Sequence, residues 1–221
     1  MTKKETIQLA DQLKTDLNNA NQFQINTWNL VRGKLSNNEN NSILRNEETA
    51  LDFIINISFH KELKITEDLI RQIHQNLSMN KNNKFAGQYR QTKALQTKSK
   101  KITPEPKDLP HFMDHFIGQV NTSKSFFHPI EFATYVYKRI FDIQPFDQGN
   151  ELVADFLISS ILINEGYGIV FIQPHKNTRF QKALELAQNY EQPDMDPIIQ
   201  IVAESVVKDE SMFGELVNLY S

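Results

Sequence analysis

The sequence has no cysteine among its 221 residues. Disulfide bonds and thiolate metal sites are therefore excluded, and a reducing compartment is expected. No apolar run approaches the about 18 residues that a membrane-spanning helix needs. Residues 2–5 are polar and are not followed by the apolar segment of a signal peptide. We therefore expect a cytoplasmic protein without membrane contact.

A strong charge of one sign is also missing, because 24 Lys and Arg residues stand against 27 Asp and Glu residues. The formal net charge of −3 gives no basic field that would attract nucleic acid or an anionic membrane. No internal repeat or low-complexity linker divides the chain, and its length is enough to bury a core without disulfides or metals. We predict one domain over residues 1–221.

Apolar residues at helical spacing make up most of the chain. The expected helices cover 4–18, 23–35, 47–57, 66–77, 109–120, 129–141, 152–164, 178–187 and 196–206, and residues 212–219 add a last helical turn. Thr66 is expected to cap its helix, and Pro129 to occupy a first helical position. Residues 88–102 lack this spacing, and we predict an extended segment with a small β-hairpin there.

The most informative stretch is residues 143–155. A polar turn containing Gly149 and Asn150 leads into a segment that is apolar on nearly every side, which is typical of a buried central helix. Such a turn directs free backbone N–H groups and the positive end of the helix dipole at one point, as anion sites do. Its side chains nevertheless include Gln148, Glu151 and Asp155, which are unsuited to holding a phosphate.

Several segments together resemble a Fic domain, the mostly helical fold of protein AMP-transferases and Doc toxins. The resemblance runs from about Trp28 to Val206 and rests on residues 87–90, 128–133, 157–167 and 180–184. It implies an N-terminal part (1–45) with an inhibitory-like segment, a Fic core (46–207) and a C-terminal tail (208–221). It also implies a flap that binds a target peptide by strand addition. The flap residues are Lys93, Ala94, Leu95 and Gln96.

The family signature HPFx[D/E]GNGRxxR falls on residues 144–155. Its turn-forming positions match at Pro145, Phe146, Gly149 and Asn150. Gly149 and Asn150 could still bind an anion or nucleotide through the backbone.

The positions that carry the family's chemistry do not match. The catalytic histidine, the metal-binding acid, the second glycine and the two phosphate-binding arginines are replaced by Gln144, Gln148, Glu151, Leu152 and Asp155. An amide cannot act as the general base, and a neutral amide is a poor Mg²⁺ ligand. A carboxylate repels a phosphate. We therefore expect no catalytic residue, no metal site and no cofactor.

Many Fic proteins carry an inhibitory pattern, [S/T]xxxE[G/N], whose glutamate pairs with the second motif arginine. Glu39 and Asn40 lie where its N-terminal version would be, although Leu35 takes the place of Ser or Thr. Glu215 fits a C-terminal version in which Leu216 replaces Gly or Asn. Both remain open.

Two hypotheses follow from the resemblance. In the first, the protein is an inactive Fic-like regulator that inhibits an active Fic AMP-transferase, as a hetero- or homodimer, by offering Glu39 or Glu215. In the second, it is a divergent enzyme that transfers a nucleotidyl or phosphate-containing group to a protein, using ATP and Mg²⁺. The positive charge would then come from Arg90, Lys93, Lys176 or Arg179.

His111 and His115 stand at i and i+4, a spacing that can hold a metal. No third ligand is evident in the sequence, and we expect both to be surface residues.

Overall fold

A computed structural model describes residues 1–19, 42–58, 63–78, 84–94, 103–170, 172, 178–189 and 191–220. The helices in these ranges are α1 (Lys3–Asn19), α3 (Ser42–Ser58), α4 (Glu67–Ser78), α5 (Leu109–Ser123), α6 (Pro129–Ile143), α7 (Asn150–Asn164), α8 (Thr178–Ala187) and α9 (Asp196–Tyr220). Short 3₁₀ turns, η2 (Pro106–Asp108) and η3 (Lys124–Phe126), precede and follow α5.

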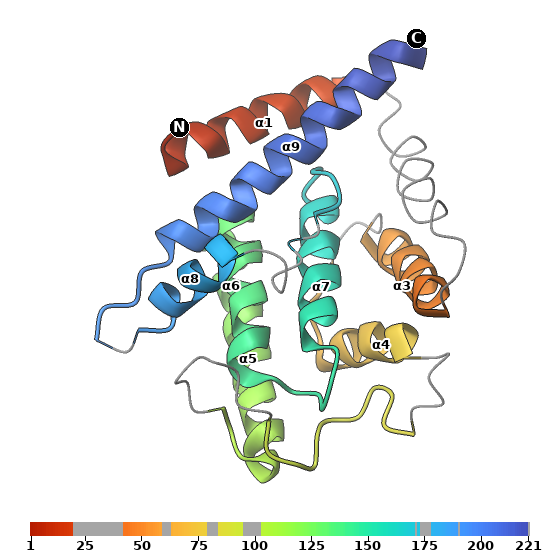
Figure 1. The fold of residues 1–221 in the computed structure, drawn as a ribbon, viewed down its shortest axis with the longest axis vertical. Helices are drawn as coiled ribbons and strands as arrows, with labels where there is room; N and C mark the ends of the chain where they lie inside the picture. Colours follow the sequence, from red (N-terminus) through yellow and green to blue (C-terminus); the bar gives the residue numbers. More distant parts are fainter. Residues whose placement is uncertain are drawn as a thin grey trace.

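Helix α7 stands at the centre of the fold, with α6 on one side and α3 and α4 on the other (Figure 1). Every residue from Val153 to Ile163 is buried, as expected for a helix that is apolar on nearly every side. Its two buried serines bond to backbone carbonyls, Ser159 to Val170 at 2.6 Å and Ser160 to Leu157 at 2.8 Å. The interior therefore accommodates their hydroxyls without an unpaired donor.

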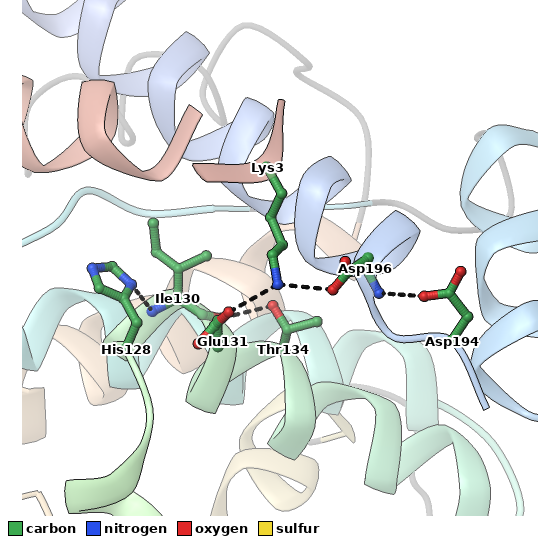
Figure 2. Close-up of polar contacts among 7 residues, drawn as sticks. All are labelled: Lys3, His128, Ile130, Glu131, Thr134, Asp194 and Asp196. Carbon is green, nitrogen blue, oxygen red and sulfur yellow. Dashed lines mark hydrogen bonds and ion pairs between the residues drawn. The ribbon is translucent and has the colours of Figure 1, made fainter. Parts of the chain in front are cut away.

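Helices α1 and α9 lie side by side across one end of the molecule (Figure 1). Figure 2 shows how Lys3 joins three helices, because its Nζ contacts Glu131 on α6 at 3.2 Å and Asp196 at the start of α9 at 2.8 Å. These carboxylates raise the pKa of Lys3, with the hydrogen bond to Asp196 as the largest cause. The charge pairs fix the N-terminal end of α1 to the core.

A second polar group fixes the middle of α1. Asp11 accepts a hydrogen bond from the Tyr167 hydroxyl, and His128 Nε2 lies 3.2 Å from the same carboxylate. His128 Nδ1 also accepts from the backbone N–H of Ile130 at 3.3 Å (Figure 2), so Nε2 carries the ring proton and donates to Asp11. One side chain thus caps α6 and holds α1.

The structure confirms several local predictions. The predicted helix over 4–18 is α1, and Pro129 is the first residue of α6. Thr66 caps α4, since its Oγ1 accepts from the Leu69 N–H at 3.1 Å. The structure also shows Gly166 after α7 with φ 87°, the left-handed conformation that suits glycine after a helix.

Three elements differ from the prediction. Helix α3 begins at Ser42, five residues before the expected start at Glu47, and α9 continues without a break to Tyr220. The predicted β-hairpin is not supported: within the described part of the flap, residues 88–94 form no strand. Residues 95–102 and the predicted helix over 23–35 lie outside the described residues.

None of the described helices is both long and apolar enough to cross a membrane.

Candidate functional site

The turn between α6 and α7 has two residues in the left-handed conformation at its ends. Gln144 caps α6 with φ 46° and donates its N–H to the Ile140 carbonyl at 2.8 Å. Gly149 precedes α7 with φ 79°. A left-handed conformation is uncommon for a residue with a Cβ, so the surrounding contacts must hold Gln144 in it.

Asn150 closes this turn from inside. Its Oδ1 accepts from the Phe146 N–H at 3.0 Å, and its Nδ2 donates to the Phe146 carbonyl at 2.8 Å. The amide therefore satisfies both backbone groups of a residue that lies outside the regular helices. Asn150 is a structural residue of the turn, in addition to any role at its surface.

Phe146 points into the core, where only 1% of it is exposed. Its ring stacks on His74 of α4, with ring centroids 3.9 Å apart and planes inclined by 10°. His74 Nδ1 in turn accepts from the Gly87 N–H at 2.9 Å, so one imidazole joins the turn to the segment before the flap. The sequence prediction missed His74. The available signal was its place between Ile73 and Leu77 on the apolar side of α4.

Arg90 holds the turn from the other side. Its guanidinium, in a residue that is 2% exposed, donates from Nε to the Gln144 carbonyl at 2.7 Å. The other two nitrogens donate to the carbonyls of Thr92 at 2.9 Å and Pro104 at 2.6 Å. The backbone N–H of Arg90 also donates to the Pro145 carbonyl at 2.9 Å. One residue therefore joins the turn, the start of the flap and the segment before α5.

The carbonyls accept hydrogen bonds from the charged guanidinium of Arg90 and so stabilise its charge inside the protein. Burial lowers the pKa of Arg90, and the nearby carboxylates of Asp147 and Glu105 act in the opposite direction. A guanidinium stays protonated in proteins, so the group remains a cation whose donors point at backbone oxygens. It does not point at the surface of the turn as a phosphate ligand would.

The solvent side of the turn is formed by Asp147, Gln148, Gly149 and Glu151, which are all exposed. Asp147 accepts a hydrogen bond from the Thr92 hydroxyl at 2.7 Å, which links the turn to the flap through side chains. The N-terminal end of α7 thus carries carboxylates where its dipole would favour an anionic ligand. The charge of these carboxylates would repel a phosphate at this end of the helix.

The two positions of the motif arginines belong to the core. Leu152 is half-buried and packs against the hydrophobic cluster. Asp155 is 2% exposed, and its Oδ1 accepts from the Ile172 N–H at 3.0 Å. Burial, with the charge of Asp155 as a second cause, raises the pKa of Tyr137 well above its ordinary value. Asp155 therefore has a hydrogen-bond partner inside the core.

The other predicted sources of positive charge are engaged elsewhere. Arg179 forms a two-point ion pair with Glu204 of α9, and Lys93 Nζ lies 3.0 Å from Glu105 Oε1. Lys176 lies outside the described residues.

Some predicted residues are not brought into the site by the described structure. Four of them lie outside the described residues: Glu39, Asn40, Leu95 and Gln96. Glu215 belongs to α9, but its side chain is outside the description. At the end of the described flap segment, Lys93 is exposed and Ala94 is half-buried. Their inhibitory and flap roles stay predictions. His111 and His115 are exposed on α5, and the described residues contain no group of three side chains able to hold a metal.

The architecture and this turn define a known class of domain. A Fic domain-containing signaling protein from Bacteroides thetaiotaomicron superposes with a TM-score of 0.76 at 17% identity, covering 94% of this chain and 96% of its own. Fic-1 of C. elegans gives a TM-score of 0.77 at 16% identity, covering 99% of this chain and 74% of its own. The fold is that of Fic domains.

Sequence comparison agrees with the fold. Residues 64–162 match the sequence model of the Fic/DOC family. The chain is 27% identical over 175 residues to a protein adenylyltransferase Fic from Aedes aegypti, and 31% identical over 166 residues to one from Nematostella vectensis. These alignments cover 79% and 75% of this chain, but 34% and 38% of those relatives. The protein belongs to the Fic/DOC family, and it spans about a third of the length of these relatives.

Arg90→Met is expected to lower the free energy of unfolding by about 3 kcal/mol or more, because it leaves several buried carbonyls without a donor. Arg90→Lys should recover only part of this loss, since an ammonium cannot reach three carbonyls in the same fork geometry. Urea denaturation measures both. Arg179→Met removes an exposed pair and should cost about 1 kcal/mol or less; equal losses for Arg90→Met and Arg179→Met would contradict the assigned role.

Asp155→Arg should destabilise the fold by about 4 kcal/mol or prevent folding, because it buries a cation and leaves the Ile172 N–H unpaired. Asp155→Asn keeps an acceptor oxygen and should cost about 1–2 kcal/mol. Glu151→Arg, at an exposed position on the same helix, should cost about 1 kcal/mol or less. Thermal and urea unfolding of the three variants checks this order, and an Asp155→Arg protein as stable as Glu151→Arg would refute it.

Proposed function

We propose that this protein is a catalytically inactive Fic-like regulator that inhibits an active Fic adenylyltransferase. The observation that carries the proposal is a division within residues 144–155. Residues that form hydrogen bonds inside the turn are kept, and residues that would act on a substrate are replaced.

Loss of the chemistry is supported position by position. Gln144 offers an amide where the family has its general base, a group that contributes roughly 10²–10⁴-fold in rate. Leu152 packs against the core, and Asp155 accepts from a backbone N–H. Neither residue can supply the cation that a triphosphate requires.

Retention of the turn supports a binding role. Holding Gln144 at positive φ costs on the order of 1 kcal/mol, and the contacts of Asn150, His74 and Arg90 offset that cost. A surface with this many internal hydrogen bonds is rigid before it meets a partner. A preformed surface loses little conformational entropy on binding, which favours recognition of a protein.

The proposed partner follows from the family. An active Fic protein has a free motif arginine, and a carboxylate of this chain, Glu39 or Glu215, would form a charge-assisted hydrogen bond with it in trans. The flap, Lys93 to Gln96, is a second proposed contact through strand addition. We propose a heterodimer or homodimer that acts in the cytoplasm without nucleic acid, membrane, metal or cofactor.

The experiment pairs the purified protein with a Fic AMP-transferase of intact motif from the same genome. We expect a complex by size-exclusion chromatography and at least a tenfold reduction in AMP transfer to a protein target. Glu39→Gln or Glu215→Gln should relieve the inhibition, whereas Glu191→Gln, at an exposed loop position, should not. If neither a complex nor inhibition is observed, the proposal is wrong.

The second candidate, a divergent nucleotidyl or phosphate-group transferase, rests on the retained backbone at Gly149 and Asn150. We expect calorimetry to show no saturable Mg²⁺-dependent ATP binding, because Asp147 and Glu151 repel the phosphates. As a positive control, a variant with Gln148→Asp, Glu151→Gly and Leu152→Arg together should bind ATP with Mg²⁺ more tightly than the unmodified chain. Tight Mg²⁺-dependent binding by the unmodified chain would establish the enzyme alternative.

A further inference from the structure

The face of α1 that packs along α9 is mostly polar. Residues three or four apart share one face of a helix, and on α1 this face carries Lys3, Thr6, Ala10 and Lys14. Among the described side chains of this helix, residues 3–15, Thr6 and Ala10 are the buried ones, and Ile7 adds a half-buried apolar contact. Little apolar area therefore holds α1 to the core, and such elements open locally at a small cost in free energy.

Ion pairs hold the start of α1. Lys3 Nζ contacts Glu131 on α6 and Asp196 on α9, and Figure 2 shows both contacts meeting at this one ammonium. The Asp196 side chain is 67% exposed, so water and salt reach the pair. Dissolved ions screen exposed charge pairs strongly and buried ones much less. The attraction at this end of α1 therefore weakens as the ionic strength rises.

A second charged group holds the middle of α1. Asp11 accepts hydrogen bonds from the Tyr167 hydroxyl and from His128, and the side chain of Asp11 is 42% exposed. Lys14 Nζ lies 4.1 Å from the centroid of the Tyr167 ring, a cation–π contact. The contacts at both positions of α1 thus involve a charged side chain of α1 near the solvent.

The contact between α1 and α9 also contains an unsatisfied polar atom. Gln200 Nε2 donates to Thr6 Oγ1 at 2.9 Å and to Glu204 Oε1 at 2.7 Å. Gln200 Oε1 is buried and has no hydrogen-bond donor among the described residues. A buried acceptor without a donor costs free energy, and separation of the two helices would let water bond to it. This atom therefore favours opening of the contact.

We propose that α1 opens away from α6 and α9 as a unit while the core stays folded, and that ionic strength controls this opening. The open form would expose Gln200 and the ring of Tyr167, which α1 contacts in the closed form. A detached helix of 17 residues is only marginally stable in water, so its backbone hydrogen bonds would break soon after opening. The proposal does not involve the motif turn, and its failure would leave the proposed regulatory function untouched.

The test is amide hydrogen exchange of the full chain, followed by mass spectrometry at low and high salt. Between about 50 mM and about 500 mM NaCl, which shortens the Debye length severalfold, we expect exchange in α1 to become at least about threefold faster. Exchange in the buried part of α7, Val153–Ile163, should change less than about 1.5-fold, because the core stays closed. Equal acceleration in α1 and α7 would show global unfolding and would overturn the proposal, as would an α1 that is insensitive to salt.

Lys3→Met should speed exchange in α1 at least about threefold at low salt, the factor expected for one or two partly exposed ion pairs. Asp11→Ala should do the same from the middle of the helix. Lys4→Met makes the same chemical change at the next residue, which is exposed, and should leave exchange in α1 within about 1.5-fold of the unmodified chain. Slow exchange in α7 establishes in the same spectra that each variant is folded. Equal exchange in α1 of Lys3→Met and Lys4→Met would overturn the proposal.

Discussion

The buried guanidinium of Arg90 is the interaction on which the site depends. A cation that is only 2% exposed is stable only when its donors are paired, and here the pairing comes from the backbone carbonyls of Gln144, Thr92 and Pro104. Those carbonyls belong to segments without regular structure, which have no helix or sheet to satisfy them. One side chain thus donates hydrogen bonds to the turn, the flap and the segment before α5, and these bonds fix the three segments relative to one another.

The motif separates structural from chemical roles. Residues whose side chains point inward, Phe146 and Asn150, still make the contacts that shape the turn. Gln148 and Glu151 lie on the solvent side of the turn, where both are exposed. Asp155 differs from both groups, because its carboxylate now pairs with the Ile172 N–H inside the core. Substitution of Asp155 would therefore disturb the fold, whereas substitution of Gln148 or Glu151 would change only the exposed side of the turn.

Helix α7 supports two different surfaces at its two ends. The N-terminal end carries the exposed carboxylates of Asp147 and Glu151, and near the C-terminal end Lys124 Nζ lies 2.8 Å from Glu165 Oε1. Both depend on the same buried helix, whose position is set by packing against α3, α4 and α6. A change in that packing would shift the residues at both ends of α7. The contacts that define each surface are nevertheless made by residues close to that surface.

Local features of the fold could be predicted from the amino-acid pattern alone. Helical spacing placed α1, α4, α5, α6 and α7, and the Thr66 cap, Pro129 and the Gly149 turn followed from the backbone preferences of single residues. The directions of the charged side chains could not be predicted in this way, because they depend on tertiary contacts. Arg90 could equally have served a phosphate, and Asp155 could have faced the site. The orientations of Arg90 and Asp155 depend on burial against segments distant in sequence. The free-energy cost of an unpaired buried charge is set by such neighbours, and no local sequence pattern encodes them.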